Sequence, residues 1–143
     1  MKPSDIAKSN TEHAHQSALI CWTRLAKTRQ LLPKASRIYA CPNGGSRGAG
    51  EGARFKAEGV RAGIPDLFLP VPWGRWPGLY IEMKKPDQAT ALKGGLSDAQ
   101  IDEIAALQTD GYPVFICYDW KDAAAVICQY FGEIGFTKAD VWE

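Results

Sequence analysis

The sequence predicts an α/β protein: a three-layer α/β/α sandwich around a central, mixed, four-stranded sheet. Two observations support this fold class. Two segments carry apolar residues at helical spacing behind recognisable N-terminal caps, and four short apolar runs have the length and flanking residues of strands. With 143 residues, of which 45% are hydrophobic and 23% charged, the chain is expected to form a single domain over residues 1–143.

The first predicted helix covers residues 11–28. Ser9 and Glu12 form a capping-box pattern at its start, in which both side chains would satisfy backbone N–H groups. Apolar residues then follow at helical spacing and would face the core: Leu19, Trp22 and Leu25 or Ala26.

Three strands are predicted in the middle of the chain. The first, at 37–41, is followed by a glycine-rich loop over 42–52 and a short helix over 52–59 that ends at a glycine. The other two strands, 66–71 and 79–83, are joined by the turn-rich sequence PWGRWPG. They are therefore expected to pair as a β-hairpin.

A second clear helix begins after Ser97 and ends at Gly111. Ser97 and Gln100 form another capping box, which gives Gln100 a structural role that competes with any role in a functional site. An unbroken apolar run at 114–118 predicts a buried strand, and residues 121–131 predict a last helix.

Charged residues stand at the ends of the two hairpin strands. Asp66 opens the first, and Glu82 and Lys84 close the second. Alternate residues of a strand share a face, so Glu82 and Lys84 point the same way, with Cα atoms roughly 6.6 Å apart, while Met83 points into the opposite layer. The hairpin would bring Asp66 alongside them. Burying these charges is costly unless they are paired or hold a metal.

This pattern suits metal-assisted phosphodiester hydrolysis. Mg²⁺ takes oxygen ligands and usually needs only one or two protein carboxylates together with substrate phosphate. A lysine beside it can position the attacking water or offset charge on the phosphate. The alternative is a purely structural Asp–Lys–Glu cluster at the sheet edge.

Charge is unevenly distributed along the chain. The net charge is +1, but residues 24–61 hold nine basic and two acidic residues (+7), whereas the remainder holds eight basic and fourteen acidic residues (−6). A one-sided field of this kind suits a polyanion, although a solvated basic face is an equal alternative. No run reaches membrane-spanning length and the first residues lack a signal-peptide pattern, so a cytoplasmic protein without a membrane partner is expected.

The glycine-rich loop allows two functions. It follows a strand and precedes a helix, as a nucleotide-binding loop would, but it lacks the Gly-Lys-Ser/Thr ending of a P-loop and the G-x-G-x-x-G spacing. Contacts to a DNA backbone are favoured instead. The expected DNA-binding residues of the basic segment are Asn43, Arg47, Arg54 and Arg61.

The pair Pro65-Asp66 followed by Glu82-x-Lys84 resembles the signature of the PD-(D/E)xK nucleases. The surrounding sequences NGG, GVRAGIPDLFL, LYIEMKKP, LSDAQ and DGYPVFICY, within residues 10–131, resemble the VRR-NUC family, in particular its small stand-alone members common in phages and prophages. The resemblance implies a restriction-endonuclease-like fold. It also implies a Mg²⁺-dependent DNA endonuclease, with Mn²⁺ as a substitute, that is selective for branched DNA such as four-way (Holliday) junctions.

The resemblance also assigns roles to individual residues. Metal ligation falls to Asp66, Glu82, the Met83 backbone carbonyl and Glu12, and catalysis to Asp66, Glu82, Lys84 and Gln100. One departure is the segment DQATALKGG between Lys84 and Gln100, which is longer than expected and affects the placement of Gln100.

A homodimer is expected for two reasons. The stand-alone family members resemble archaeal Holliday-junction resolvases, which act as two-fold dimers. A junction is resolved by two symmetric cuts and one chain carries one site, so an isologous interface would supply the second. Trp73, Trp76 or Trp142 could furnish this interface, and the tip residues could instead stack on bases or fold back. The rival functions are a non-catalytic DNA-binding module and a nucleotide-binding protein.

Overall fold

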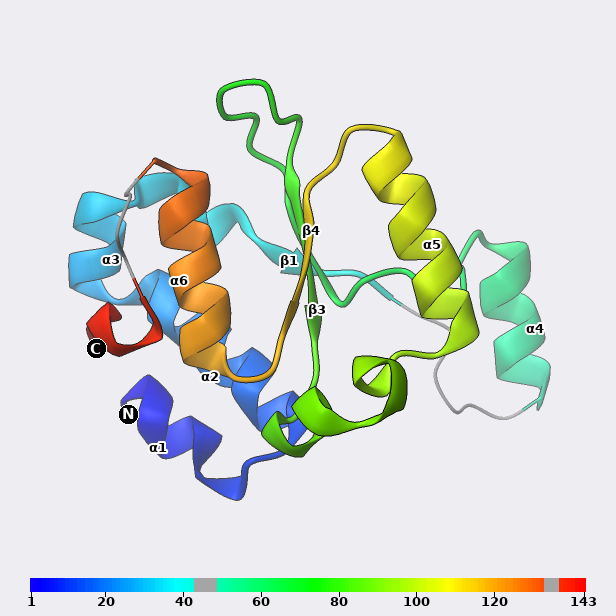
Figure 1. Ribbon diagram of the computed structural model, residues 1–143, viewed down its shortest axis with the longest axis horizontal. Coiled ribbons are helices and arrows are strands. Elements are labelled where there is room, and N and C mark those ends of the chain that lie inside the picture. The colour runs from blue at the N-terminus through cyan, green and yellow to red at the C-terminus, as the bar shows by residue number, and fades with distance from the viewer. Residues whose placement is uncertain (43–48, 133–136) are drawn as a thin grey trace.

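A computed structural model describes residues 1–42, 49–132 and 137–143 (Figure 1). Over these residues the sheet has four strands in the order β1-β2-β3-β4, with β1 antiparallel to β2, β2 antiparallel to β3, and β3 parallel to β4. The bounds are Tyr39–Ala40 for β1, Leu67–Leu69 for β2, Leu79–Met83 for β3 and Val114–Cys117 for β4. The predicted mixed α/β sheet is confirmed.

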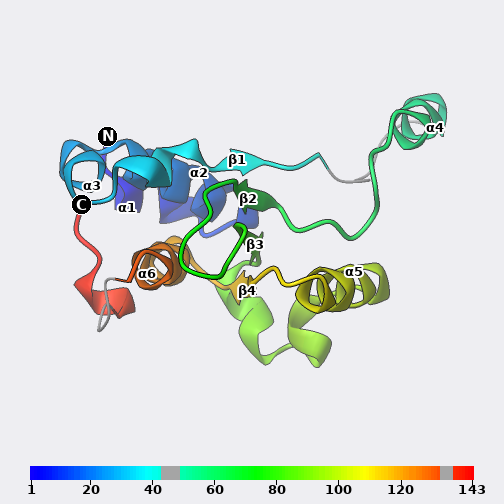
Figure 2. The same cartoon turned by 90° about the horizontal axis from the view of Figure 1, so that it is seen from above.

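Helices cover both faces of this sheet (Figures 1 and 2). One face carries α1 (Pro3–Ile6), α2 (Glu12–Arg24), α3 (Ala26–Leu31) and α6 (Trp120–Tyr130). The other side carries α5 (Asp98–Thr109) and, farther from the sheet, α4 (Ala49–Ala57). Short 3₁₀ segments complete the described chain: η1 (Ala7–Ser9), η2 (Pro33–Arg37), η3 (Pro86–Thr90), η4 (Leu92–Gly95) and η5 (Lys138–Asp140). None of the helices described here has both the length and the apolar composition to cross a membrane.

The main core lies between the sheet and the α2–α6 layer. Leu67, Leu69 and Ile81 point into it from β2 and β3 and are fully buried, and Trp22 and Ile127 meet them from the two helices. Complete burial of each such side chain contributes about 1.5–3 kcal/mol. This face of the sheet therefore supplies much of the stability, and it fixes the register that positions the residues of the opposite face.

The hairpin forms as predicted, although its first strand is shorter than 66–71. β2 pairs with β3 in the register Leu67↔Ile81 and Leu69↔Leu79, and β3 has the predicted bounds. Gly78 fixes the close approach at the return, because a Cβ there would lie 2.8 Å from the Phe68 ring and 3.0 Å from the Leu69 carbonyl oxygen.

The predicted first helix starts within one residue of its expected bound, but its cap and its uninterrupted course to residue 28 are wrong. Asn10 takes a left-handed conformation (φ 58°) and turns the chain, so that Thr11 becomes the N-cap and its Oγ1 accepts a hydrogen bond from the Ala14 N–H at 3.1 Å. The helix then breaks at Leu25, which is extended, and resumes as α3. The Ser9–Glu12 capping box therefore does not form, and Glu12 stands in the first turn without a capping role.

The glycine-rich loop is only partly described. The expected contacts Asn43 and Arg47 lie outside the described residues. The predicted boundary at residue 52 is wrong, because α4 already begins at Ala49 and so includes Gly50 and Gly52. Part of the segment expected to be a loop is therefore helical.

Candidate functional site

Three carboxylates converge at the open end of the hairpin. The register that pairs Leu67 with Ile81 brings Asp66, at the start of β2, beside Glu82 on β3. Glu12 reaches the same place from the first turn of α2, and all three residues offer a carboxylate oxygen within 4.8 Å of the others. Glu82 is 1% exposed, whereas the other two are half-buried.

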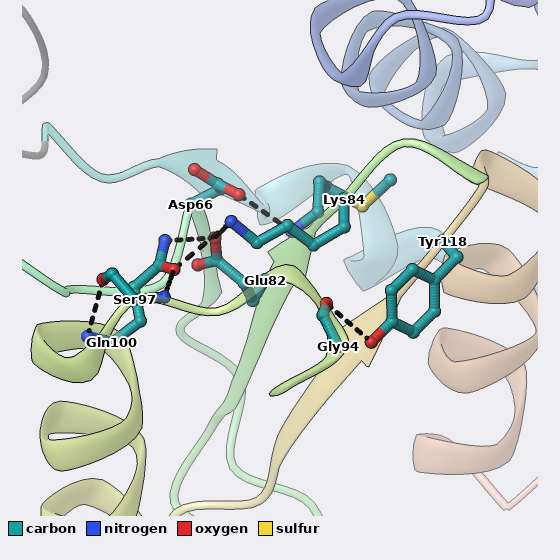
Figure 3. Close-up of polar contacts among 8 residues, drawn as sticks. Asp66, Glu82, Lys84, Gly94, Ser97, Gln100 and Tyr118 are labelled. Atoms are coloured by element: carbon teal, nitrogen blue, oxygen red, sulfur yellow. Dashed lines mark hydrogen bonds and ion pairs between the residues drawn. The ribbon is translucent and has the colours of Figure 1, made fainter. Parts of the chain in front are cut away.

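Backbone contacts hold Asp66 in place (Figure 3). Its Oδ2 accepts a hydrogen bond from the Met83 N–H at 2.8 Å, and its carbonyl oxygen accepts one from the Cys41 N–H at 2.8 Å. The Met83 side chain is fully buried in the core, which is the opposite layer predicted from strand alternation. A role for the Met83 carbonyl as a metal ligand stays a prediction.

Lys84 lies beside Glu82 in the interior of the site (Figure 3). Its backbone N–H donates to the Cys117 carbonyl at 2.9 Å and so extends the β3–β4 ladder. Its Nζ lies 3.7 Å from Glu82 Oε1 and donates to Gln100 Oε1 at 3.2 Å. Only 8% of the residue is exposed, so the ammonium group is held among polar atoms of the site.

Gln100 joins the cap of α5 to the site, so its capping bonds do not exclude contacts with the site residues. Its Oε1 accepts from the Ser97 N–H at 2.9 Å, and Ser97 Oγ accepts from the Gln100 N–H at 3.2 Å, which completes the predicted capping box. The same side chain donates from Nε2 to Glu82 Oε1 at 2.9 Å and accepts from Lys84. One amide thus ties the helix N-terminus to the carboxylates.

The long segment before α5 still delivers Gln100 to the site. It folds into η3 and η4, where Lys93 (φ 56°), Gly94 and Gly95 are left-handed in succession. The Tyr118 hydroxyl donates to the Gly94 carbonyl at 3.0 Å and leaves no room for a Cβ there (Figure 3). The double glycine was the sequence signal for this compact turn, which the sequence reasoning missed.

Burial raises the pKa values of the three carboxyl groups of the site. Burial, followed by the neighbouring Asp66 carboxyl, raises the pKa of Glu82 to about 8. Burial also raises the pKa of Asp66 and of Glu12. Like-charged carboxylates this close cannot all ionise easily without a compensating cation.

A divalent cation fits this donor set. Glu82 Oε2 is buried and receives no hydrogen bond from a donor group of the described residues, and the Asp66 carboxyl beside Glu82 can only share a proton with it. The side-chain atoms that could ligate a metal here are all carboxylate oxygens, which are the ligands that Mg²⁺ and Mn²⁺ favour.

The expected DNA-binding arginines that are described lie outside this cluster. Arg54 on α4 is exposed and lies 3.7 Å from Glu58, and Arg61 is exposed and donates to Glu103 on α5 at 2.9 Å. The Arg54–Glu58 pair is exposed on both sides and contributes little to stability, whereas the Glu103 side chain in the other pair is only 15% exposed. Both guanidinium groups are open to solvent and could exchange their partners for phosphates.

The hairpin tip lies at the other end of the strands from the carboxylates. Trp73 is 44% exposed and packs edge-on against Phe131, and Arg75 lies over the Trp76 ring at 4.4 Å. Trp142 is half-buried against the domain itself, where its Nε1–H donates to Thr28 Oγ1 at 3.2 Å. Trp142 is thus committed to packing within its own chain.

A mixed sheet with this acid–acid–lysine arrangement at the end of its hairpin defines a restriction-endonuclease-like domain. The model of the VRR-NUC domain matches residues 2–120. A solved structure described as a VRR_NUC domain protein is 31% identical to the chain, covers 85% of it and 88% of its own length, and superposes with a TM-score of 0.66. No curated protein matches the chain. The chain belongs to the VRR-NUC family, which has a nuclease-type fold.

Proposed function

We propose that the protein is a metal-dependent endonuclease that hydrolyses DNA phosphodiester bonds, with Mg²⁺ as the ion and Mn²⁺ as a substitute. The observation that carries the proposal is the convergence of Glu12, Asp66 and Glu82 beside Lys84, with one Glu82 oxygen buried and unsatisfied. Such an oxygen reduces stability unless a ligand occupies it.

The acids of the site would ligate the metal ion, and Lys84 and Gln100 would position the reacting groups. Asp66, Glu82 and Glu12, with the Met83 carbonyl, would hold the cation. When bound, the cation would polarise the phosphate and neutralise the charge that develops on it. Lys84 has three N–H donors and gives one to Gln100, so the others can bind a phosphate oxygen or the attacking water. Gln100 keeps both Lys84 and Glu82 oriented.

The arrangement favours an enzyme over a non-catalytic DNA-binding module. A module that binds only the DNA backbone gains nothing from clustered, partly buried acids, because they repel phosphates when ionised and cost folding energy. A non-catalytic module on this fold would also be expected to lack one of the acid–acid–lysine residues, whereas Asp66, Glu82 and Lys84 are all present. No observation on the described residues favours the nucleotide-binding alternative.

The preferred substrate is branched DNA, such as a four-way junction, and the active assembly is a homodimer. One chain carries one acid–acid–lysine cluster, whereas a junction needs two symmetric cuts, which a two-fold dimer would supply. Phosphate contacts from the basic segment 24–61, with Arg54 and Arg61 exposed within it, would provide most of the affinity.

The test is an incubation of the purified protein with labelled linear, flap, forked and four-way DNA, with EDTA, Mg²⁺ or Mn²⁺. We expect paired, metal-dependent nicks in the branched substrates, little cleavage of linear duplex, and loss of nearly all cleavage in Lys84→Ala with metal binding retained. Cleavage that persists in EDTA or in Lys84→Ala would overturn the assignment. Light scattering that shows a monomer, with flaps cut faster than junctions, would remove the junction-resolving dimer and leave the nuclease.

A further inference from the structure

A row of aromatic rings crosses the sheet on the face that carries the acids. The strand pairings Tyr39↔Phe68 and Phe68↔Tyr80 place these side chains on one face. Their ring centroids lie 5.9 Å and 4.4 Å apart, and Tyr112 closes the row at 5.4 Å from Tyr80. The row thus spans three strands as one packed unit.

This row continues directly into the candidate site. Asp66 lies two residues before Phe68 and Glu82 two residues after Tyr80, so both acids project from the same face as the rings. With roughly 4.8 Å between strands and roughly 6.6 Å between alternate residues, the Cα atoms of Tyr39 and Asp66 lie roughly 8 Å apart. At roughly 3.4 Å per stacked nucleotide, this distance corresponds to about two or three nucleotides.

Tyr39, at the outer end of the row, is not part of the hydrophobic core. Phe68, Tyr80 and Tyr112 are half-buried and support one another, whereas Tyr39 is 52% exposed. Most of the buried apolar residues of the sheet lie on its other face, where Leu67 and Ile81 are fully buried. Tyr39 is therefore a rigidly backed ring presented to solvent beside the acids.

The charge around the row suits a nucleic acid. Strand β1, which carries Tyr39, lies within the basic segment 24–61, and the exposed Arg37 stands two residues before it. A neutral, flat ring in a basic segment can bind a base through its π-face while nearby cations hold the backbone. Bases in the interior of a duplex are stacked on both faces and leave no π-face free, so such a surface selects unpaired nucleotides over the interior of a duplex.

We propose that Tyr39, backed by Phe68 and Tyr80, is a stacking platform for an unpaired base of the substrate, about two or three nucleotides from the bond that is cut. The inference deepens the proposed nuclease function, because it identifies the substrate as branched DNA in which a base beside the scissile phosphate is unpaired or is opened at the branch point. Stacking without base-edge hydrogen bonds also implies little sequence preference.

The experiment measures binding without cleavage, with Lys84→Ala protein in Ca²⁺. The probes are a blunt duplex and the same duplex with a short single-stranded gap that contains 2-aminopurine, whose fluorescence falls on stacking. The variants Tyr39→Ala and Tyr39→Phe are made in the Lys84→Ala protein. The matched control is Phe115→Ala, because Phe115 is 44% exposed on the other face of the sheet, opposite Ile81.

Base–aromatic stacking contributes about 1–3 kcal/mol, so Tyr39→Ala should weaken gapped-DNA binding about 5- to 150-fold. Duplex binding should change less than about two-fold by the same reasoning, since no base is free to stack. The 2-aminopurine quench should disappear in Tyr39→Ala and persist in Tyr39→Phe and Phe115→Ala.

Equal losses on duplex and gapped DNA, or no loss on either, would overturn the platform. A change in oligomeric state of Tyr39→Ala, seen by light scattering, would also overturn it and assign this face to a second copy of the chain. Because no step requires cleavage, the platform and the nuclease can fail separately. A protein that binds gapped DNA through Tyr39 but never cuts it would refute only the nuclease.

Discussion

Replacing Gln100 with alanine separates two roles that a single amide performs. The change removes the bond to the Ser97 N–H, which belongs to the helix cap, and the bonds to Glu82 and Lys84, which belong to the site. Ser97→Ala is the matched control, because it removes the other half of the cap and leaves the amide in place.

The expected magnitudes differ between the two variants. Loss of a cap costs about 1 kcal/mol, so Ser97→Ala should lower Tm by about 2–4 °C and change activity by less than about three-fold. Gln100→Ala also loses hydrogen bonds to charged groups, which contribute about 1.5–3 kcal/mol. If that energy orients Lys84 and Glu82 in the transition state, the cleavage rate falls about 10- to 150-fold.

Thermal unfolding and single-turnover cleavage of branched DNA in Mg²⁺ measure both effects. A third variant, Gln100→Glu, keeps a capping-box residue but sets a carboxylate against Glu82, so it should retain the cap and still lose cleavage. The reasoning is refuted if Ser97→Ala and Gln100→Ala lose the same activity, or if Gln100→Glu cleaves like the unaltered protein.

Three other predictions concern the acids and the basic surface. In EDTA, folded Glu82 holds a proton that the unfolded chain releases, so the free energy of unfolding should fall as the pH rises from about 4.5 to about 8, and Glu82→Gln should reduce this fall in pH-dependent thermal melts, leaving the part that the raised pKa values of Asp66 and Glu12 contribute. Glu12→Gln should weaken Mg²⁺ or Mn²⁺ binding in calorimetry, whereas Thr11→Ala, which affects only the α2 cap, should lower Tm by about 2–4 °C with unchanged metal affinity. Equal metal affinity in the two variants would exclude Glu12 from the site. Arg54→Ala combined with Arg61→Ala should reduce the slope of log affinity against log salt by about 1 to 2 for every DNA tested, and an unchanged slope would make these arginines a solvated surface.

The hairpin and the pairing of its charged ends could be predicted because they depend on local patterns. The runs LFL and LYI alternate between core and outer face, and the turn-rich sequence between them leaves antiparallel pairing as the simple connection. Once Leu67 pairs with Ile81, the proximity of Asp66 and Glu82 follows from the register alone.

The placement of Glu12 could not be derived in the same way. Three consecutive residues, Ser9, Asn10 and Thr11, are all favourable N-caps, and the left-handed turn at Asn10 selects Thr11. That choice converts Glu12 from a capping residue into a neighbour of Asp66. The contact joins residues far apart in sequence, so it depends on how α2 docks on the sheet and carries no local signal.

Side chains of β3 alternate between the hydrophobic core on one face of the sheet and the candidate site on the other. Leu79, Ile81 and Met83 are fully buried on the face covered by α2 and α6. Glu82 projects from the opposite face beside Lys84. A pairing slip of one residue would turn the acid and the lysine into the core and bring the apolar side chains out. The apolar burial that stabilises this strand therefore also fixes the direction of the charged groups. The hydrophobic core and Gly78 at the return of the hairpin are thus as necessary to the geometry of the site as the hydrogen bonds around Gln100.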